Sequence, residues 1–491
     1  MKIRIMCLFW ILVYPAFARV ITYPAPKCNL LSNEYVLKIR EAGGQWQPAD
    51  VYHGNVAEVV NTKMLPRKTS FAYFDCSGNV EVSVYVTTKK INFARIRPFS
   101  LGIEPVIKGN TITFSIGTNQ NVSLEIDGDI FQNLQIFANA IERDRPSVKD
   151  TNVIYYGPGV HHIGRVRLGS DKTVYLAGGA IVDGGFTLYH AKNVRILGRG
   201  ILTQLETGSS ATKAMKNTNQ KTGRPDAVTI AYSEDVEVSG LVMLSRKYSV
   251  LIGQSARVKV SDIKSFSCEG NADGIDIFSS TDVLLDHVFM RNSDDCIAIY
   301  GHRWNYYGNA QNINIKNSTL WADVAHPILI GTHGDSQHPD SLSQIKFSNM
   351  DILNQRENQM DYQGCMALNA GDSNLIDGVV FDNIRVDEIR KGQLFNIRVM
   401  FNKKYNTSAG SGIRNILFKD IAYRGQNAPL SIIAGYDDQR KISNVMFDNL
   451  RINDKVITDT MEGKPSFYKT GDMANIFIGE HVENIKFSGT R

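Results

Sequence analysis

Residues 258–287 read VKVSDIKSFSCEGNADGIDIFSSTDVLLDH, and the same short phrase stands at both ends of this stretch. The phrase is apolar-x-apolar-x, followed by Asn, Asp, Gly or His; Val258 begins one copy and Val283 begins the next. Copies recur between residues 236 and 449 at intervals of 22 to 37 residues. One short strand phrase per interval, with no amphipathic helix between copies, is typical of a solenoid.

Each phrase is too short to bury its own apolar face, so successive coils must stack on one another. Asn, Asp or Gly at the fifth position suits a tight turn with a left-handed backbone residue. The pattern therefore predicts a right-handed parallel β-helix over residues 146–491. A β-propeller is the alternative, but its blades need an even spacing of about 40 residues, and here the spacing drifts.

Residues 19–145 show a different periodicity. The segments NVEVSVYV (79–86) and NTITFSI (110–116) alternate along their length, with Gly and Asn turn signals between them. This predicts an antiparallel, immunoglobulin-like β-sandwich in front of the β-helix, and an all-β chain. A polar stretch at 142–150, ERDRPSVKD, is interpreted as the linker.

The first 18 residues predict a cleavable signal peptide. Lys2 and Arg4 precede an apolar run, and Ala16-Phe17-Ala18 is a small-x-small cleavage pattern. The apolar run is too short for a membrane anchor, which needs about 20 residues. We therefore expect an exported protein, periplasmic or extracellular, with no membrane insertion once the signal is removed.

Composition limits the partners. The chain is 43% hydrophobic and 21% charged, as in soluble globular proteins. Its formal charge of +5 falls to +3 without the two basic residues of the signal, which is too mild and too evenly spread to indicate nucleic acid. We expect a monomer that binds a polysaccharide or oligosaccharide.

The five cysteines beyond the signal are scattered and contain no C-x-x-C pair, which argues against a zinc site. A disulfide between Cys28 and Cys76 is left open, whereas Cys268, Cys296 and Cys365 are expected to be buried. The adjacent His161 and His162 would face opposite sides of a strand. No metal and no cofactor are expected.

A second strand phrase threads between the copies of the first, at residues 250–252, 275–277, 297–299 and 328–330. Two residues before each of these segments stand, in order, Tyr248, Asp273, Asp295 and His326, with Asp294 beside Asp295. Because neighbouring strands lie about 4.8 Å apart, stacking would bring these carboxylates together. Glycoside hydrolysis needs two carboxyl groups, and crowding like charges raises at least one pKa.

Strict alternation would turn Asp273 toward the core together with Ile275. We therefore expect the backbone to bend near Gly274 and again before Cys296. Asp276, Asp282 and Asp286 are also interpretable as turn residues; of these, Asp276 is in addition a candidate for substrate binding.

Aromatic residues follow the acidic pair in HRWNYYG (302–308). Sugars present apolar C–H faces that aromatic rings cover, so Trp304, Tyr306 and Tyr307 are predicted to form subsite walls. The alternative is a loop held by its own aromatic rings. His333 is a further candidate for substrate binding, with an exposed turn histidine as the alternative.

These motifs resemble glycoside hydrolase family 28, the polygalacturonases, which carry N-T-D-x-x-D, then D-D-C, then H-G-x-S-x-G on a right-handed parallel β-helix. Here the matching segments are NADGID, DDC and HPILIGTHG. The resemblance implies an inverting mechanism, with Asp294 as general acid and Asp273 and Asp295 polarising the attacking water. It also implies that His326 supports the acid.

Two departures from family 28 concern the substrate. The family's Arg-Ile-Lys motif, which binds the substrate carboxylate, is missing from residues 354–374, and Pro327 replaces the glycine after the histidine. The chain is also similar to family 49, the dextranases and isopullulanases, in which a β-sandwich precedes the β-helix. The segments 94–142, 153–164, 173–186 and 318–331 carry this likeness.

The function predicted from the sequence is inverting hydrolysis of α-glycosidic bonds. The substrate is either a neutral α-glucan or a pectic glycan. Two alternatives stay open: a β-helix polysaccharide lyase, disfavoured because no cationic base is evident beside the acids, and a non-catalytic carbohydrate-binding β-helix. The sugar, the linkage and endo or exo action are not decided by the sequence.

Overall fold

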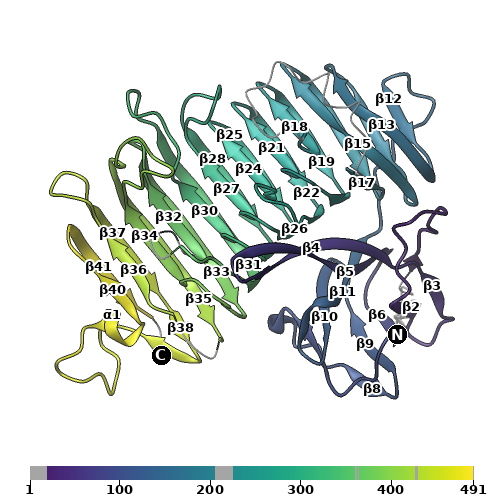
Figure 1. Ribbon diagram of the computed structural model, residues 1–491, viewed down its shortest axis with the longest axis horizontal. Helices are drawn as coiled ribbons and strands as arrows, with labels where there is room; N and C mark the ends of the chain where they lie inside the picture. The colour runs from purple at the N-terminus through teal and green to yellow at the C-terminus, as the bar shows by residue number, and fades with distance from the viewer. Residues whose placement is uncertain (1–18, 205–224, 360–361, 363, 426–428, 490–491) are drawn as a thin grey trace, which may run out of the picture.

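The computed structural model describes residues 19–204, 225–359, 362, 364–425 and 429–489. The predicted signal peptide lies outside these residues. An N-terminal β-sandwich is followed by a right-handed parallel β-helix of thirty strands, β12 to β41 (Figure 1). The all-β prediction is confirmed, and the propeller alternative is wrong, since the strands stack coil on coil in parallel rows instead of forming separate blades.

The sandwich consists of two sheets that share one apolar core. The first contains β1 (Val20–Ile21), β4 (Tyr52–Val60), β5 (Lys63–Cys76), β7 (Ala94–Arg97), β10 (Gln120–Ile126) and β11 (Asp129–Ala140). The second contains β2 (Tyr35–Glu41), β3 (Gln47–Ala49), β6 (Val80–Val86), β8 (Val106–Lys108) and β9 (Thr111–Ile116). The short helix η1 (Phe99–Leu101) follows β7.

The two alternating segments of the sequence form β6 and β9, as predicted. One pair in the sandwich differs from the antiparallel prediction, because β5 and β11 are parallel. Between them the chain crosses to the second sheet and back, which allows β11 to return in the direction of β5.

The β-helix strands form three faces. The first face contains β12 (Val153–Tyr156), β14 (Thr173–Leu176), β16 (Lys192–Gly198), β19 (Glu234–Ser239), β22 (Ala256–Ser261), β25 (Thr281–Asp286), β28 (Ala310–Lys316), β37 (Ile442–Asp448) and β41 (Val482–Ser488). The second contains β17 (Ile201–Thr203), β20 (Val242–Leu244), β23 (Lys264–Phe266), β26 (Phe289–Asn292), β29 (Thr319–Ala322) and β38 (Leu450–Ile452). The long strands β31 (Ser341–Asn354), β33 (Leu375–Val386) and β35 (Gly412–Tyr423) run from the first face into the second.

The third face contains β18 (Val228–Ala231), β21 (Val250–Gly253), β24 (Ile275–Phe278), β27 (Ile297–Tyr300), β30 (Ile328–Gly331), β32 (Met366–Ala370), β34 (Phe395–Val399), β36 (Ser431–Ala434) and β40 (Ile476–Ile478). The strands β13 (Gly159–Leu168) and β15 (Ala180–Tyr189) run from the second face into the third. Near the end of the chain, β39 (Lys455–Ile457) pairs with β38, and α1 (Thr470–Met473) is a single turn.

The fifth position of the repeated phrase turns the chain between the first and second faces. All eight residues at this position have a positive φ, as the sequence predicted: Gly240 (85°), Asp262 (54°), His287 (56°), Asn317 (53°), Asn349 (52°), Asn383 (59°), Asp420 (52°) and Asn449 (60°). Asn and Asp tolerate this conformation and also link the coils, since Asn317 donates to Asp286 and Asn349 donates to Asn317, both at 2.8 Å. The turns therefore stabilise the stack as well as permitting it.

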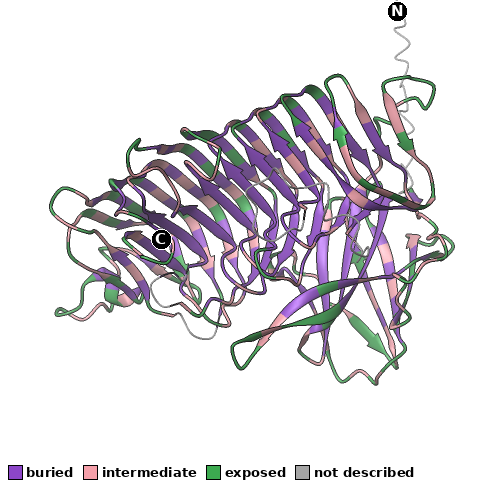
Figure 2. Ribbon diagram, turned by 45° about the horizontal axis from the view of Figure 1, so that its top comes forward, coloured by how far each residue is buried: buried purple, intermediate pink, exposed green. Residues whose placement is uncertain are grey.

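The interior of the β-helix is a continuous apolar column (Figure 2). Aliphatic side chains fill it through most coils, and aromatic rings fill its C-terminal part. Five phenylalanines stack there with centroids 4.8 to 5.0 Å apart: Phe347, Phe381, Phe418, Phe447 and Phe487. Burying one such side chain stabilises a fold by about 1.5–3 kcal/mol.

Cys28 and Cys76, whose pairing the sequence left undecided, do not form a disulfide. Cys76 is buried in the sandwich core, whereas Cys28 packs at the boundary with the β-helix. Cys296 and Cys365 are buried as expected, but Cys268 is partly exposed because it lies in the turn after β23.

The sandwich packs its first sheet against the second face of the β-helix. Phe71 stacks on Phe266 with ring centroids 5.3 Å apart, and Phe137 contacts Phe289 at 5.0 Å. Charged groups are buried in the same interface. Arg291 pairs with Asp323 at 3.0 Å, and its guanidinium lies 3.9 Å from the ring centroid of Trp321.

Arg291 also joins the two domains directly. Its guanidinium donates to Asn133 Oδ1 at 3.0 Å and to the Ile130 carbonyl at 2.7 Å, both in β11. A second guanidinium, that of Arg97, lies 4.6 Å from the Trp321 centroid and pairs with Glu125. Buried charges of this kind are tolerated only when they are fully paired.

Replacing Arg291 with Ala should lower the free energy of unfolding by about 3–5 kcal/mol, because Asp323 would keep a buried charge with one partner fewer. Arg257→Ala is the matched control, since Arg257 pairs with Asp235 at the exposed surface and should cost about 1 kcal/mol or less. Denaturant unfolding of both variants measures the difference. Equal losses in the two variants would show that the interface does not depend on this pair.

Candidate active site

Four successive turns between the second and third faces hold the carboxylates predicted from the sequence. They precede β21, β24, β27 and β30. The backbone ladder continues through these turns: Ser249 N donates to Asp273 O at 3.1 Å, Gly274 N to Asp295 O at 2.8 Å and Cys296 N to His326 O at 2.8 Å. Tyr248, Asp273, Asp295 and His326 are therefore stacked on consecutive coils.

Three carboxylates meet at this column. Asp273, Asp294 and Asp295 each place an oxygen within 4.8 Å of the other two. The backbone bends at Gly274 and at Cys296, and β24 begins only at Ile275, so the strand pleat does not dictate the direction of Asp273. Gly274 permits the close approach of the coils, since a Cβ there would lie 2.2 Å from the Cys296 carbonyl oxygen.

His326 and Asp295 form a buried pair. Nδ1 of His326 donates to Asp295 Oδ1 at 2.7 Å, and Nε2 donates to the Tyr362 carbonyl at 2.7 Å. Burial opposes protonation of this ring, but the Asp295 carboxylate overcomes it and raises the pKa of His326 to about 9. Because both ring nitrogens face acceptors, His326 is an imidazolium. Tyr300 donates to the other Asp295 oxygen at 3.3 Å.

Asp294 is the least buried of the three carboxyls. Burial and the neighbouring Asp295 raise its pKa to about 7, and the Asn271 backbone N–H, which donates to Asp294 Oδ2 at 3.0 Å, partly opposes the rise. Burial also raises the pKa of Asp273, and the charges of Asp276, Asp294 and Asp295 raise it further. The site therefore holds both protonated and ionised carboxyl groups near neutral pH.

Asp276 is not a turn residue, and that interpretation is wrong. It lies in the middle of β24, on the outer side of the third face, where its register neighbours are Leu251 and Ala298. Only 1% of the residue is exposed, and its Oδ1 has no hydrogen-bond partner among the described residues. Burial and the charges of Asp295 and Asp294 raise its pKa. Asp282 also lies in a strand, β25, where it is exposed and has a φ of 55°, so its interpretation as a turn residue is wrong as well.

Of the three aromatic residues predicted to line the substrate site, two lie in one cluster and the third lies outside it. Trp304 stacks on Tyr248 with centroids 6.3 Å apart, and it meets Phe278 edge-on at 5.5 Å. Tyr306 also packs against Phe278, next to Gly253. The structure does not bring Tyr307 into this cluster: the residue is 57% exposed and its ring lies against His302.

His333 is a partly buried residue beside the carboxylates. Its ring meets Tyr300 edge-on with centroids 5.0 Å apart, and Tyr300 in turn donates to Asp295. Burial and the positive charge of Arg303 together lower the pKa of His333 to about 3. The ring is therefore neutral, unlike that of His326, and the alternative of an exposed turn histidine is wrong.

Sequence reasoning missed two cations next to the column. Lys247 directly precedes Tyr248, and its charge favours ionisation of Asp273. Arg303 belongs to the loop after β27, and its charge favours ionisation of Asp276. Lys247 could have been identified from the sequence, because it stands next to Tyr248, the first residue of the predicted column. The position of Arg303 depends on how its loop folds, which the repeat does not predict.

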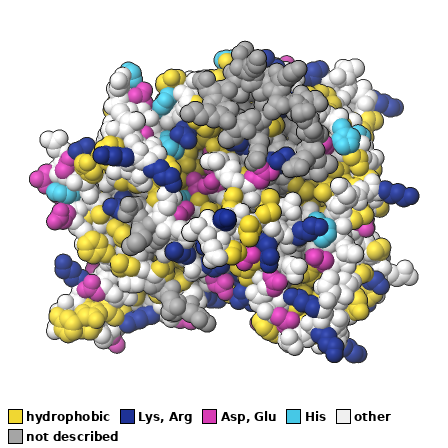
Figure 3. Space-filling model, viewed as in Figure 1, with side chains coloured by type: hydrophobic (Ala, Val, Ile, Leu, Met, Phe, Trp, Pro, Cys, Tyr) yellow, Lys and Arg dark blue, Asp and Glu magenta, His cyan; other side chains and the backbone are white. Residues whose placement is uncertain are grey.

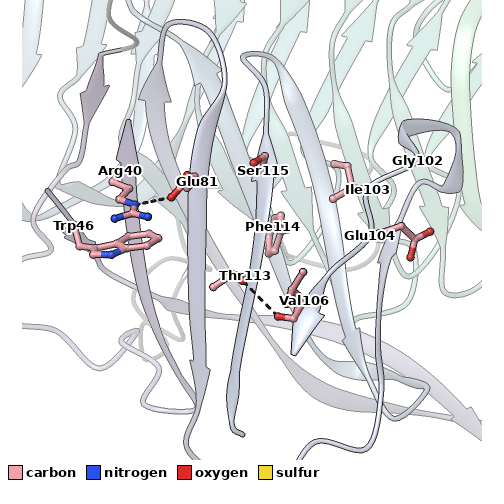
Figure 4. A pocket seen from close by; sticks show the side chains of 10 residues that line it. All are labelled: Arg40, Trp46, Glu81, Gly102, Ile103, Glu104, Val106, Thr113, Phe114 and Ser115. Atoms are coloured by element: carbon pink, nitrogen blue, oxygen red, sulfur yellow. Dashed lines mark hydrogen bonds and ion pairs between the residues drawn. The ribbon is translucent and has the colours of Figure 1, made fainter. Parts of the chain in front are cut away.

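The sandwich contains a separate hollow of about 580 Å³ (Figure 4). Arg40 and Trp46 lie on one side of it, with the Arg40 guanidinium 4.3 Å from the Trp46 centroid. Arg40 also pairs with Glu81 at 2.5 Å, whereas Glu104 lies across the hollow. Because no two carboxylates are crowded in this lining, the hollow lacks the feature that distinguishes the column.

The described surface carries both signs of charge. Lys and Arg side chains are interspersed with Asp and Glu on the face that Figure 3 shows. Among the described residues, no helix has the length and apolar character that a membrane crossing requires.

The sequence profile of glycosyl hydrolases family 28 matches residues 183–466, which is more than half of the chain and includes all four turns of the column. The chain belongs to family 28. Its relatives in the family are distant. A polygalacturonase from Fusarium fujikuroi is 25% identical over 228 residues, which are 45% of this chain and 54% of that protein. A polygalacturonase from Juniperus ashei is 26% identical over 242 residues, 46% of this chain and 43% of that protein. The chain thus spans about half the length of the curated relatives it matches.

Solved structures show the same fold within and beyond family 28. Dex49A from Penicillium minioluteum superposes with a TM-score of 0.62 at 14% identity, over 95% of this chain and 96% of its own. A family 28 exopolygalacturonase from Yersinia enterocolitica gives a TM-score of 0.53 at 12% identity, over 84% of this chain and 97% of its own. The predicted likeness to families 28 and 49 is therefore confirmed at the level of fold.

Replacing Asp294 with Asn should stabilise the protein increasingly as the pH rises. The pKa of Asp294 is higher in the folded chain than the ordinary 3.8, so its contribution to stability is complete below that value and is lost as the pH rises through about 7. Asn mimics the protonated carboxyl at every pH. The gain over the native chain should grow by about 1–2 kcal/mol between pH 5 and pH 8.

Thermal unfolding at the two pH values measures this difference. Asp282→Asn is the control, since Asp282 is an exposed residue of β25 with a positive φ, a conformation that Asn also adopts. A gain at Asp294 that did not change with pH would contradict the raised pKa.

Proposed function

We propose that the protein is an exported glycoside hydrolase that cleaves α-glycosidic bonds in a polysaccharide or oligosaccharide with inversion. The observation that carries this proposal is the meeting of Asp273, Asp294 and Asp295, with oxygens within 4.8 Å and the pKa of one carboxyl at about 7. A carboxyl that is half protonated near neutrality can donate a proton, while an ionised neighbour accepts one. Export rests on the predicted signal peptide alone.

In this mechanism Asp294 gives its proton to the glycosidic oxygen as the bond to the anomeric carbon breaks. Asp273 and Asp295 orient a water molecule, whose oxygen bonds to the anomeric carbon while its proton passes to a carboxylate. His326 is a positioning residue: as an imidazolium it fixes the orientation of the Asp295 carboxylate through a 2.7 Å hydrogen bond. Each cycle consumes one water and restores Asp294 by proton exchange with solvent.

Inversion sets a condition on where the attacking water lies. Acid and base in inverting glycosidases usually lie about 6.5–9.5 Å apart, which leaves room for water between them. The nearest carboxyl oxygens lie within 4.8 Å here. Inversion therefore needs the water to lie beside the three carboxylates rather than between two of them, and its support is the membership of family 28.

The substrate is either a neutral α-glucan or a pectic glycan. Polygalacturonases are among the relatives, which favours a pectic glycan. The missing Arg-x-Lys motif and the likeness in fold to Dex49A favour a neutral glucan. We assign substrate contacts to Asp276, Trp304, Tyr306 and His333, whereas the exposed Tyr307 would reach only a distal part of a long chain.

A second candidate function is polysaccharide elimination. Three carboxylate oxygens within 4.8 Å can ligate a divalent cation such as calcium. The sequence argued against a lyase because no cationic base was evident beside the acids; the structure contradicts that argument, since Lys247 and Arg303 lie on the same side as the aspartates. A lyase would release an unsaturated sugar and would lose activity with a chelator.

Asp294→Asn should lower kcat by about 10²- to 10⁴-fold, the usual effect of removing a general acid. The measurement is product analysis with dextran, pullulan and polygalacturonate, with and without a chelator. We expect saturated reducing sugars, formed regardless of chelator, whose first anomer is β when followed by NMR during hydrolysis. The control Asp282→Asn keeps full activity.

Three outcomes would contradict the proposal. Unsaturated products that need the metal would establish the lyase, and α products would establish retention. Full activity in the Asp294→Asn variant would remove Asp294 from the mechanism.

A further inference from the structure

The outer face of the second sandwich sheet carries a tryptophan that lies outside the sandwich core. The first sheet packs against the β-helix, and the second sheet lies on the side away from it (Figure 1). Every second side chain of β2, β6 and β9 is buried, and those between them are exposed or half-exposed. Trp46 directly precedes β3 and is 37% exposed. Large aromatic rings of this kind are enriched on binding surfaces.

Strand register places an arginine beside this tryptophan. β2 and β3 pair antiparallel, with Ile39 opposite Gln47. The next pair along the two strands is Arg40 and Trp46, and the guanidinium lies 4.3 Å from the ring centroid. The Nε of Arg40 donates to Glu81 at 2.5 Å, and among the described residues its other two guanidinium nitrogens donate to no acceptor. The ring and the carboxylate thus orient a guanidinium that still has N–H groups for a ligand.

The hollow beside this pair has a lining that suits a sugar (Figure 4). Its volume of about 580 Å³ lies within the range of about 300–1,000 Å³ usual for ligand pockets. Thr113 and Ser115 contribute hydroxyl groups to the lining, and Ile103 and Val106 contribute apolar surface. A sugar presents hydroxyl groups at its edge and apolar C–H groups on its faces. The lining therefore offers partners to both parts of a sugar ring.

The charges of the lining favour a neutral sugar. Among the described residues that line the hollow, Arg40 is the cation, whereas Glu81 and Glu104 are carboxylates. Because Arg40 is paired with Glu81, one negative charge remains in excess and repels an acidic sugar. Lys38 and Lys108 lie on the same sheet face but do not line the hollow. An acidic glycan would therefore have to bind beside the hollow instead of in it.

We propose that this hollow is a second glycan site, which binds a neutral α-glucan chain without cleaving it. The choice of an α-glucan rests on the proposed function, whereas the site itself does not. A polymer that is held here stays attached to the protein while another part of it reaches the carboxylate column. Its effective concentration at the column then rises without any new contact there.

Folding is the competing explanation for this group of side chains. Arg40, Trp46 and Glu81 join three strands of the second sheet, and such a contact can be purely structural. Exposed ion pairs contribute little to stability. A structural role therefore predicts a small change in thermal unfolding and no selective loss of glycan binding when Trp46 is replaced.

The test is a binding measurement with the full chain carrying Asp294→Asn, so that the glycan is not consumed. Dextran and pullulan are the neutral probes, and polygalacturonate is the acidic probe. Affinity electrophoresis in native gels that contain each glycan gives the dissociation constants. We expect a neutral glucan to retard the chain more strongly than polygalacturonate does.

Adding Trp46→Ala should weaken binding of the neutral glucan at least about tenfold, because an aromatic anchor is lost. Arg40→Gln should act in the same direction, and Trp46→Phe should retain most of the affinity. Phe467→Ala is the matched control, since Phe467 is an 81% exposed aromatic residue between β39 and α1. Thermal unfolding of each variant verifies its fold.

Hydrolysis by the chain without Asp294→Asn gives a second readout. Trp46→Ala should raise the ratio of the KM for the polymer to the KM for a short oligosaccharide of the same glucan about tenfold, because a short ligand cannot occupy both sites. Absence of hydrolysis in every chain would count against the hydrolase and leave the electrophoresis result intact.

Three results would overturn the proposal. The first is equal binding of the neutral glucan by the Trp46→Ala and Phe467→Ala variants, and the second is no binding of either neutral glucan. The third is a dimer, detected by light scattering, that Trp46→Ala dissociates, since this would assign the face to a second copy of the chain. Binding of polygalacturonate that depended on Trp46 and exceeded that of both glucans would likewise contradict a neutral ligand.

Discussion

Parallel coils stacked in register impose one requirement on every part of this structure: a residue has the same neighbours, one coil above and one below, at about 4.8 Å. In the interior this requirement favours like on like, as in the column of phenylalanines from Phe347 to Phe487. At the turns it favours Asn and Asp, which accept the left-handed conformation and bond to the next coil. At the carboxylate column it forces like charges together.

That forced proximity makes the column chemically useful and energetically costly at once. Asp295 is compensated by the His326 imidazolium and by the His326 backbone N–H at 3.1 Å. The cost of burying Asp273 and Asp276 is offset by fewer hydrogen bonds, since each has a buried oxygen with no partner among the described residues. The crowded carboxylates thus destabilise the folded chain and offset part of the stability that the apolar interior provides, as is common at functional sites.

The parts of the fold that depend on periodicity could be predicted from the sequence. The first repeated phrase predicted the stacking of coils and the turn at its fifth position. The second strand phrase predicted the alignment of Asp273, Asp295 and His326. The bend at Gly274 followed from a conflict between that alignment and strand alternation. Asp276 was interpreted partly as a turn residue, although the strand phrase at residues 275–277 already placed it between two strand residues and, by alternation, on the outer face.

Features that depend on contacts between distant segments could not be predicted. Arg303 reaches the column only because its loop folds back through the bridge between Arg303 and Tyr306. Arg97, Arg291 and Trp321 look like ordinary strand residues in the sequence, and their association requires the docked sandwich. The sequence left a Cys28–Cys76 disulfide open, and only the fold shows that Cys76 lies in the sandwich core and Cys28 at the domain boundary.

The docked sandwich has a consequence for how this chain can be divided. The Arg291 guanidinium contacts β11 of the sandwich, and Asp294 follows Arg291 by only three residues. A shortened chain that began at β12 would leave Arg291, Asp323 and Trp321 facing solvent directly beneath the carboxylates. An exchange of sandwiches between relatives would therefore have to carry the complementary surface of the second face with it.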